Sequence, residues 1–139
     1  MQNRLPRITA AEYQTLAALR HALRRFLRFS EEAAQKAGLK PQHHQALLAI
    51  KGTRTGQRLT MGELAERLQI RPHSAVGLAN RLVAEGLAAR KSDVADRRQV
   101  FLGLTPRGEG VLRKLSAAHK EQLRRVGPHI GELLERLRG

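Results

Sequence analysis

Hydrophobic side chains recur along most of this chain at steps of three and four residues, the period of an α-helix buried on one side. Between residues 86 and 105 the period changes, and two short apolar runs separated by a polar segment indicate a β-hairpin. The pattern therefore predicts a mainly helical protein with one small hairpin. The expected helices cover residues 9–38, 41–51, 60–68, 72–85, 105–126 and 128–138, and the expected strands cover 87–91 and 99–104.

The two helices before the hairpin have well-marked ends. Thr60 and Glu63 have the spacing of a capping box, in which each side chain binds the backbone N–H of the other residue. Pro72 suits the first position of a helix, where its missing N–H costs nothing, and Gly86 suits the left-handed position that ends one. Two short helices joined by a tight turn predict a helix-turn-helix.

The hairpin has a polar tip, residues 92–98, and leads directly to Thr105 and Pro106, which suit the N-cap and first position of another helix. A helix-turn-helix joined to such a hairpin is a winged helix-turn-helix. The first expected helix, 9–38, rises about 1.5 Å per residue and so exceeds the thickness of a small domain. Its projecting apolar end, together with the short terminal helix 128–138, predicts contact with a twofold mate.

The composition favours one domain with a polyanionic partner. The chain has 139 residues, 41% of them hydrophobic but only 3% aromatic, so a core of leucine and alanine is expected. Its net charge of +14 favours DNA, RNA or an anionic membrane face. The absence of cysteine excludes disulfides, thiolate metal sites and thiol-based redox sensing. No apolar run reaches the roughly 18 residues that span a bilayer, and no signal peptide is evident, so a cytoplasmic location is expected.

Catalytic motifs are missing from the sequence. There is no phosphate-binding glycine loop, nucleophile motif or distinctively spaced pair of carboxylates, so we expect neither an enzyme nor a bound cofactor. His43, His44 and His119 raise the question of a metal, since imidazole is a common zinc ligand. Without cysteine and without a His-x-x-x-His pair, no metal site is predicted.

The polar face of the second helix is the first candidate for a DNA contact. In a helix-turn-helix this helix enters the major groove, where its N-terminal residues reach base edges. Gly77 allows close backbone approach, and arginine and asparagine suit guanine and adenine. Arg71 and Arg81 have an alternative, which is to pair with a nearby glutamate or a phosphate. The candidates on this face are Arg71, His73, Ser74, Gly77, Asn80 and Arg81.

The hairpin tip is the second candidate. Arg97 or Arg98 can enter the minor groove, whose concentrated negative potential attracts guanidinium groups. A solvated charged turn is the alternative. Thr60, Arg90 and Lys91 are better suited to phosphate contacts, which position a protein without specifying sequence.

Several stretches of this region resemble the sequences of a known protein family. They are residues 59–65, 82–87, 96–100 and 104–108. In them an Asp-x-Arg pattern is followed, after a strand, by Leu-Thr-x-x-Gly, and this is the most specific part. Together with the chain length and the flanking helices, they resemble the MarR family of transcriptional regulators. The resemblance covers essentially the whole chain.

The resemblance implies a homodimer joined through its terminal helices. Residues 9–38 and 105–138 are then the dimerisation helices, and residues 41–104 the DNA-binding region of a single domain, 1–139. The Asp-x-Arg pattern implies that Asp96 orients the wing while Arg98 contacts DNA, a role that Arg97 can share.

The resemblance also implies release from DNA by a small aromatic or anionic ligand bound between the winged part and the dimer helices. A carboxylate or phenolate suits a basic lining. The alternative is that the histidines are simply solvated. The residues available to line such a cleft are Arg20, His21 and Arg24 on the first helix and His43, His44 and Leu47 on the second.

These inferences predict a homodimeric, sequence-specific regulator of transcription. We expect a repressor bound to a pseudo-palindromic operator in double-stranded DNA, with half-sites about one helical turn apart. The alternative is a nonspecific architectural DNA-binding protein, which the charge of +14 favours. An RNA-binding role is weaker, because single strands are usually held by stacking aromatics, and these are scarce.

Overall fold

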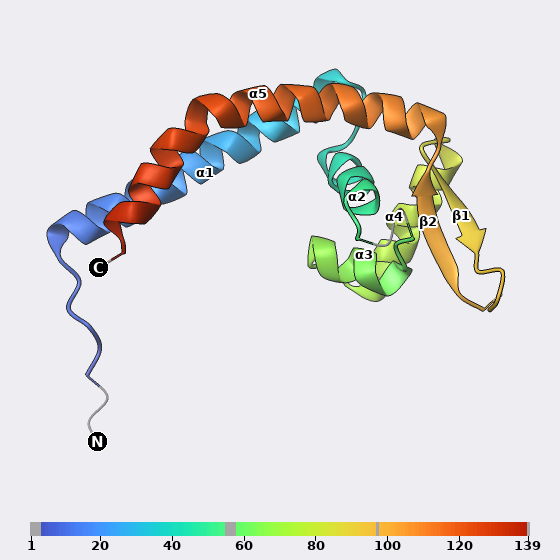
Figure 1. Ribbon diagram of the computed structural model, residues 1–139, viewed down its shortest axis with the longest axis horizontal. Helices are drawn as coiled ribbons and strands as arrows, with labels where there is room; N and C mark the ends of the chain where they lie inside the picture. Colours follow the sequence, from blue (N-terminus) through green and yellow to red (C-terminus); the bar gives the residue numbers. More distant parts are fainter. Residues whose placement is uncertain (1–3, 55–57, 97, 139) are drawn as a thin grey trace. The chain divides into compact units, whose positions relative to one another are not determined.

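The computed structural model describes residues 4–54, 58–96 and 98–138. The mainly helical fold with one antiparallel hairpin is confirmed (Figure 1). Its elements are α1 (Ala10–Lys36), α2 (Pro41–Lys51), α3 (Met61–Leu68), α4 (Pro72–Ala84), β1 (Ala88–Ser92), β2 (Val100–Leu104) and α5 (Pro106–Arg136).

Contacts divide the chain into two compact units. The winged unit comprises residues 31–117, and the helical unit comprises the described residues 4–30 and 118–138. Both long helices, α1 and α5, contribute to each unit. No helix in the described ranges combines the length and the apolar character needed to cross a membrane.

The winged unit has a core of leucine and alanine, as the composition suggests. α4 packs on α3 and on β1, while α2 packs on α3 and β2. Strand β1 pairs with β2 in a register that places Ala88 opposite Leu104. The largest fully buried side chains of this core are Leu47, Ile50, Leu59, Leu64, Leu78, Leu82, Leu87 and Leu102.

The Leu-Thr-x-x-Gly motif closes this unit where β2 meets α5. The Thr105 hydroxyl donates to the Gly86 carbonyl at 2.6 Å and accepts the Gly108 N–H at 3.1 Å. Gly108 lies so close to the preceding segment that an added Cβ would be 2.0 Å from the Leu87 carbonyl oxygen. Only glycine permits this approach, so the motif fixes the start of α5 against the end of α4.

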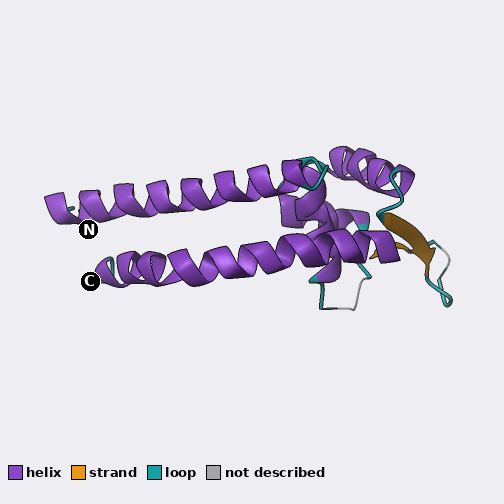
Figure 2. Cartoon of the chain, turned by 90° about the horizontal axis from the view of Figure 1, so that it is seen from above, coloured by secondary structure: helices purple, strands orange, loops and turns teal. Residues whose placement is uncertain are grey.

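In the helical unit, parts of α1 and α5 run side by side and antiparallel (Figure 2). His119 Nε2 lies 2.8 Å from Ser30 Oγ. Further along, Thr15 of α1 and Leu133 of α5 line one hollow of about 500 Å³. Moving along α1 toward its N-terminus therefore corresponds to moving along α5 toward its C-terminus, as expected for antiparallel helices.

The predicted helix break at Gly127 and Pro128 is wrong, because α5 continues through Pro128 to Arg136. A proline inside a helix leaves the carbonyl four residues earlier without its N–H partner. Here that residue is Arg124, which is exposed, so water can satisfy the carbonyl. The inward positions Ile130 and Leu133 also continue the apolar face of α5, and their packing favours an unbroken helix.

Candidate nucleic-acid interface

Residues at both ends of α3 and at the start of α4 fix the geometry of the helix-turn-helix. Thr60 and Glu63 form the predicted capping box, in which the Thr60 hydroxyl accepts the Glu63 N–H at 3.1 Å and donates to its carboxylate at 3.0 Å. Gln69 ends α3 in the left-handed conformation, with φ of 54°, and its side-chain amide donates to the Glu66 carbonyl at 2.8 Å. Pro72 then starts α4 as predicted.

The spacing of its apolar residues gives α4 one buried and one exposed face. Ala75, Leu78, Ala79 and Leu82 are buried against the core. The predicted DNA-contacting side chains are exposed on the other side of the helix, and Gly77 is half-buried. The exposed candidates are Arg71, His73, Ser74, Asn80 and Arg81.

Gly77 lies in the interior of α4 without any packing reason for a glycine. A Cβ built on it meets nothing within 4 Å. Its φ is not in the left-handed region either, because only Gly38 and Gly86 have positive φ among the described glycines. Neither the fold nor the backbone conformation therefore requires glycine here, and the open space lies on a helix whose neighbouring side chains are polar.

A side-chain contact joins α4 to the hairpin. Arg90 of β1 donates a hydrogen bond from Nη2 to Asn80 Oδ1. One of the carbonyl lone pairs of Asn80 is thereby used inside the protein, while its amide N–H groups remain available as donors. Lys91 follows on the same strand and is exposed. Thr60, by contrast, already uses its hydroxyl in the capping box.

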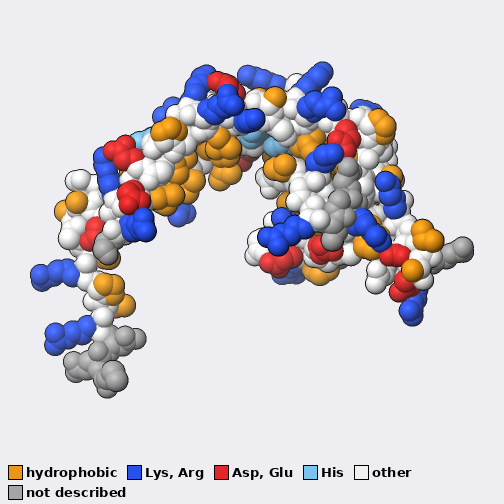
Figure 3. All heavy atoms as spheres, viewed as in Figure 1, with side chains coloured by type: hydrophobic (Ala, Val, Ile, Leu, Met, Phe, Trp, Pro, Cys, Tyr) orange, Lys and Arg blue, Asp and Glu red, His pale blue; other side chains and the backbone are white. Residues whose placement is uncertain are grey.

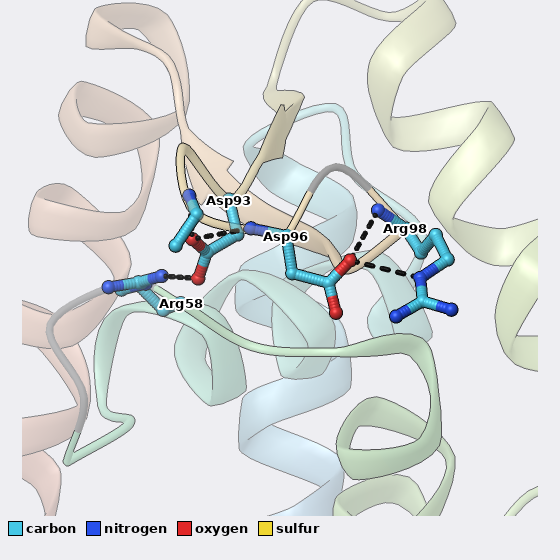
Figure 4. A network of polar contacts seen from close by, with 5 residues as sticks. Arg58, Asp93, Asp96 and Arg98 are labelled. Atoms are coloured by element: carbon cyan, nitrogen blue, oxygen red, sulfur yellow. Dashed lines mark hydrogen bonds and ion pairs between the residues drawn. The ribbon is translucent and has the colours of Figure 1, made fainter.

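Two aspartates organise the wing tip, and one of them, Asp96, forms hydrogen bonds with Arg98 (Figure 4). Asp96 Oδ1 accepts two hydrogen bonds from Arg98, one from the backbone N at 3.1 Å and one from the side-chain Nε at 3.2 Å. The Arg98 side chain is 92% exposed, so the pair aligns the base of the guanidinium and leaves its outer N–H groups directed to solvent. Arg97 lies outside the described residues.

The second aspartate, Asp93, was not among the predicted site residues. Its carboxylate accepts the backbone N–H groups of Ala95 at 2.7 Å and Asp96 at 3.3 Å, and an N–H of Arg58 at 2.6 Å (Figure 4). The two backbone N–H groups, and after them the Arg58 guanidinium, hold the pKa of the Asp93 carboxyl below its ordinary value of 3.8, although partial burial acts in the opposite direction. Asp93 is therefore charged and ordered at neutral pH.

Arg58 connects this tip to the beginning of the helix-turn-helix. Its guanidinium carbon lies 4.5 Å from the centroid of the Phe101 ring on β2, a cation–π geometry. The adjacent Leu59 forms an isolated antiparallel bridge with Leu102. The wing is thus attached to the segment that precedes α3. Aspartate at the start of a turn often accepts backbone hydrogen bonds from the residues that follow, so the role of Asp93 could have been predicted from the sequence. No local pattern indicates the role of Arg58.

The predicted ligand residues divide between the two units. On α2 of the winged unit, His43, His44 and Leu47 are buried, and His43 Nδ1 lies 3.3 Å from Glu85 Oε2 at the end of α4. On α1 of the helical unit, the remaining three are exposed: Arg20, His21 and Arg24. Within the described residues, no three histidine, aspartate or glutamate side chains are grouped as a metal site would require.

The two helices, their tight turn and the attached hairpin define a winged helix-turn-helix protein. A sequence profile described as MarR family matches residues 37–99, which include α2, α3, α4 and β1. Over these residues the chain is similar to the MarR family of transcriptional regulators. It is also 32% identical over 89 residues to the HTH-type transcriptional repressor MdtR of Bacillus subtilis (strain 168). That alignment covers 64% of this chain and 56% of the repressor, so the chain spans little more than half the length of this relative.

Solved structures share the fold over most of the chain. CouR from Rhodococcus jostii RHA1, bound to p-coumaroyl-CoA, has a TM-score of 0.72 at 18% identity, covering 93% of each chain. A MepR variant from Staphylococcus aureus, bound to an oligodeoxyribonucleotide, has a TM-score of 0.66 at 18% identity, covering 84% of this chain and 82% of that one. At these identities the likeness is one of fold.

Proposed function

We propose that the protein is a homodimeric repressor that binds a pseudo-palindromic operator in double-stranded DNA. One observation carries the proposal: α4 buries an apolar face and exposes a face rich in hydrogen-bond donors, next to a hairpin whose Arg98 is held by Asp96 and 92% exposed. The exposed side chains of α4 suit base edges and phosphates in the major groove, and Arg98 suits the minor groove. Arg90 and Lys91 then contact phosphates.

The direct test is selection from a random duplex pool, followed by footprinting of the winning sequence. We expect an inverted repeat with half-sites about one helical turn apart. Asn80→Ala should reduce discrimination at individual base pairs, whereas Lys91→Gln should weaken all duplexes alike and lower the salt dependence. Recovery of an asymmetric site, or equal binding to every duplex, would contradict the proposal.

The dimer is supported by an apolar stripe on the outer side of α1. Tyr13, Leu16, Leu23 and Leu27 recur at helical spacing on either side of Arg20, and each of these four apolar side chains is at least 45% exposed. An exposed stripe of this length is typical of a subunit interface. We expect Leu23→Arg to convert the dimer to a monomer in sedimentation velocity. Leu48→Arg is the matched control, because Leu48 is an equally exposed leucine on α2. A monomeric wild-type chain would exclude the interface.

We also propose that a small aromatic or anionic ligand weakens DNA binding. The support is chemical: Arg20, His21 and Arg24 offer cationic or polar groups to an anion, and the solved CouR structure contains p-coumaroyl-CoA. Titrating p-coumarate and p-coumaroyl-CoA into the operator complex tests this. An Arg20→Gln/Arg24→Gln variant should keep its operator affinity and lose the ligand response. If neither compound releases wild-type protein, this ligand class is excluded.

A nonspecific architectural role is the second candidate, and the charge of +14 favours it. The two functions differ in the ratio of operator to random-duplex affinity at matched salt. A specific regulator typically shows a ratio of about a thousand or more, whereas an architectural protein shows a ratio near one.

A further inference from the structure

The exposed face of α4 contains one large hydrophobic side chain among its polar candidates. All of α4 lies within the described residues, and Val76 is the one large hydrophobic side chain on it that is exposed, at 42%. Single hydrophobic side chains at a surface are ordinary, and on the visible side of the winged unit they are scattered among charged and polar ones (Figure 3). The position of Val76 on the helix, rather than its exposure, therefore decides what it can bind.

Val76 lies on the same side of α4 as Asn80. The two residues are four positions apart, so their Cβ atoms are about 5–6 Å from each other on one face of the helix. Gly77, the residue after Val76, adds no side chain, and a Cβ built on it would meet nothing within 4 Å. A nonpolar group and a hydrogen-bonding group therefore lie one turn apart, next to open space, on the face that we assign to the major groove.

The contact with Arg90 determines which group Asn80 offers to DNA. A guanidinium group carries only hydrogen-bond donors, so the Asn80 atom that binds Arg90 Nη2 is the side-chain carbonyl oxygen. The amide N–H groups of Asn80 are not used in this contact, and Asn80 is exposed. With its oxygen bound to a cation of the hairpin, Asn80 offers its N–H groups to DNA and acts as a donor.

An asparagine that acts only as a donor does not suit adenine. Asparagine normally reads adenine through two hydrogen bonds, in which its nitrogen donates to N7 and its oxygen accepts from the N6 amino group. Arg90 competes with that amino group, because its N–H groups and positive charge already lie at the Asn80 oxygen. The acceptors of the major groove that have no amino donor on the same base are O6 and N7 of guanine and O4 of thymine.

Val76 distinguishes between these two bases. Thymine carries a C5-methyl group beside O4 on its major-groove edge, and apolar side chains contact this methyl group. Guanine has no methyl group there. A valine one helical turn from a donor therefore matches thymine in both features.

We propose that Val76 and Asn80 form a thymine-reading pair, in which Val76 contacts the C5-methyl group, Asn80 donates to O4, and Arg90 holds Asn80 in the donor role. Arg90 is then a positioning residue for base recognition, in addition to its proposed phosphate contact. All three residues belong to the winged unit. The inference rests on the proposed binding to an operator, and it names the base that this part of α4 recognises.

The first test removes single methyl groups from the DNA and uses the full-length protein. Each thymine of the selected operator is replaced in turn, in both half-sites, by deoxyuridine, which lacks only the C5-methyl group. We expect one symmetric pair of positions at which wild-type affinity falls by about fourfold per half-site. Val76→Ala should bind the thymine and deoxyuridine operators equally. Leu48→Ala, which truncates an exposed side chain on α2, is the matched control and should keep the wild-type difference.

The second test inverts the same T·A pair to A·T in both half-sites, which preserves the base composition. Wild-type protein should prefer T·A by at least about tenfold. Arg90→Ala frees the Asn80 oxygen for the N6 amino group of adenine, so this preference should fall by at least about fivefold. Lys91→Ala is the matched control on the same strand, because it removes a neighbouring exposed charge and should weaken both duplexes alike. Loss of a phosphate contact or of stability does not change the base preference.

Each part of the inference can fail while operator binding stands. If no thymine is sensitive to deoxyuridine, or if Val76→Ala shows the same loss as wild type, the methyl contact is overturned. Selection of guanine or adenine at the base pair whose discrimination depends on Asn80 would overturn the thymine assignment. An unchanged T·A preference in Arg90→Ala would overturn the positioning role. If no operator can be selected at all, the proposed function itself fails, and the inference fails with it.

Discussion

Replacing Gly77 with alanine separates the stability of α4 from its proposed contact with DNA. Glycine in a helix interior is about 1 kcal/mol less favourable than alanine. The new methyl group would meet no atom within 4 Å, so the substitution adds no strain to offset this gain. We therefore expect Gly77→Ala to stabilise the protein by about 1 kcal/mol, raising Tm by about 4 °C.

On DNA the same substitution should act in the opposite direction. If the backbone of α4 approaches the floor or wall of the major groove at Gly77, a methyl group there displaces the helix and weakens its polar contacts. A loss of at least about tenfold in operator affinity is expected, corresponding to about 1.4 kcal/mol. The variant would then be more stable than wild type and yet bind less tightly, a combination that general unfolding cannot produce.

Gly110→Ala provides the matched control. Gly110 also lies inside a helix, α5, and a Cβ on it likewise meets nothing within 4 Å. Thermal melts should show a similar gain in both variants, while fluorescence anisotropy on the selected operator should detect weaker binding only for Gly77→Ala. Unchanged operator affinity for Gly77→Ala would refute close approach at this position. A lower Tm would refute the packing argument itself.

Three further predictions concern the scaffold of the site. Thr60→Ala removes the capping box and should cost about 1 kcal/mol in urea denaturation, with Thr60→Ser close to wild type. Gly108→Ala brings a Cβ to 2.0 Å from the Leu87 carbonyl oxygen and should destabilise by about 1–3 kcal/mol or prevent folding; an unchanged melt would contradict the contact. Because the pKa of Asp93 is lowered, its contribution to stability is present at neutral pH and down to 3.8, and is lost as the pH falls further through the folded-state pKa. In an NMR titration the Ala95 amide should follow this loss, and Asp93→Asn should abolish that transition.

Helix boundaries that depend on residues a few positions apart were predictable from the sequence. The capping box of Thr60 and Glu63, the helix start at Pro72 and the left-handed Gly86 all occur where expected. Each depends on local geometry that no distant packing alters. The same kind of signal failed at Pro128, because the inward residues of α5 on either side favour a continuous helix and the freed carbonyl is exposed.

Parts of the candidate site were accessible to the same reasoning and others were not. The exposed face of α4 follows from helical periodicity, since burying every third or fourth residue leaves the intervening side chains in solvent. The left-handed Gln69 was not anticipated, because glutamine carries no preference for that conformation and its cost is offset by hydrogen bonds to Glu66.

Local residue patterns were enough to predict which segments become helices and strands, where most of them begin and end, and which side of α4 is polar. These properties depend on the spacing of residues over one or two helical turns, so they can be predicted from the sequence. The contact between Arg58 and Asp93, 35 positions apart, and the close approach of Gly108 to the Leu87 carbonyl became visible from the folded chain alone. Such contacts arise from the packing of elements brought together by the core, and many different distant pairs are compatible with the same local pattern.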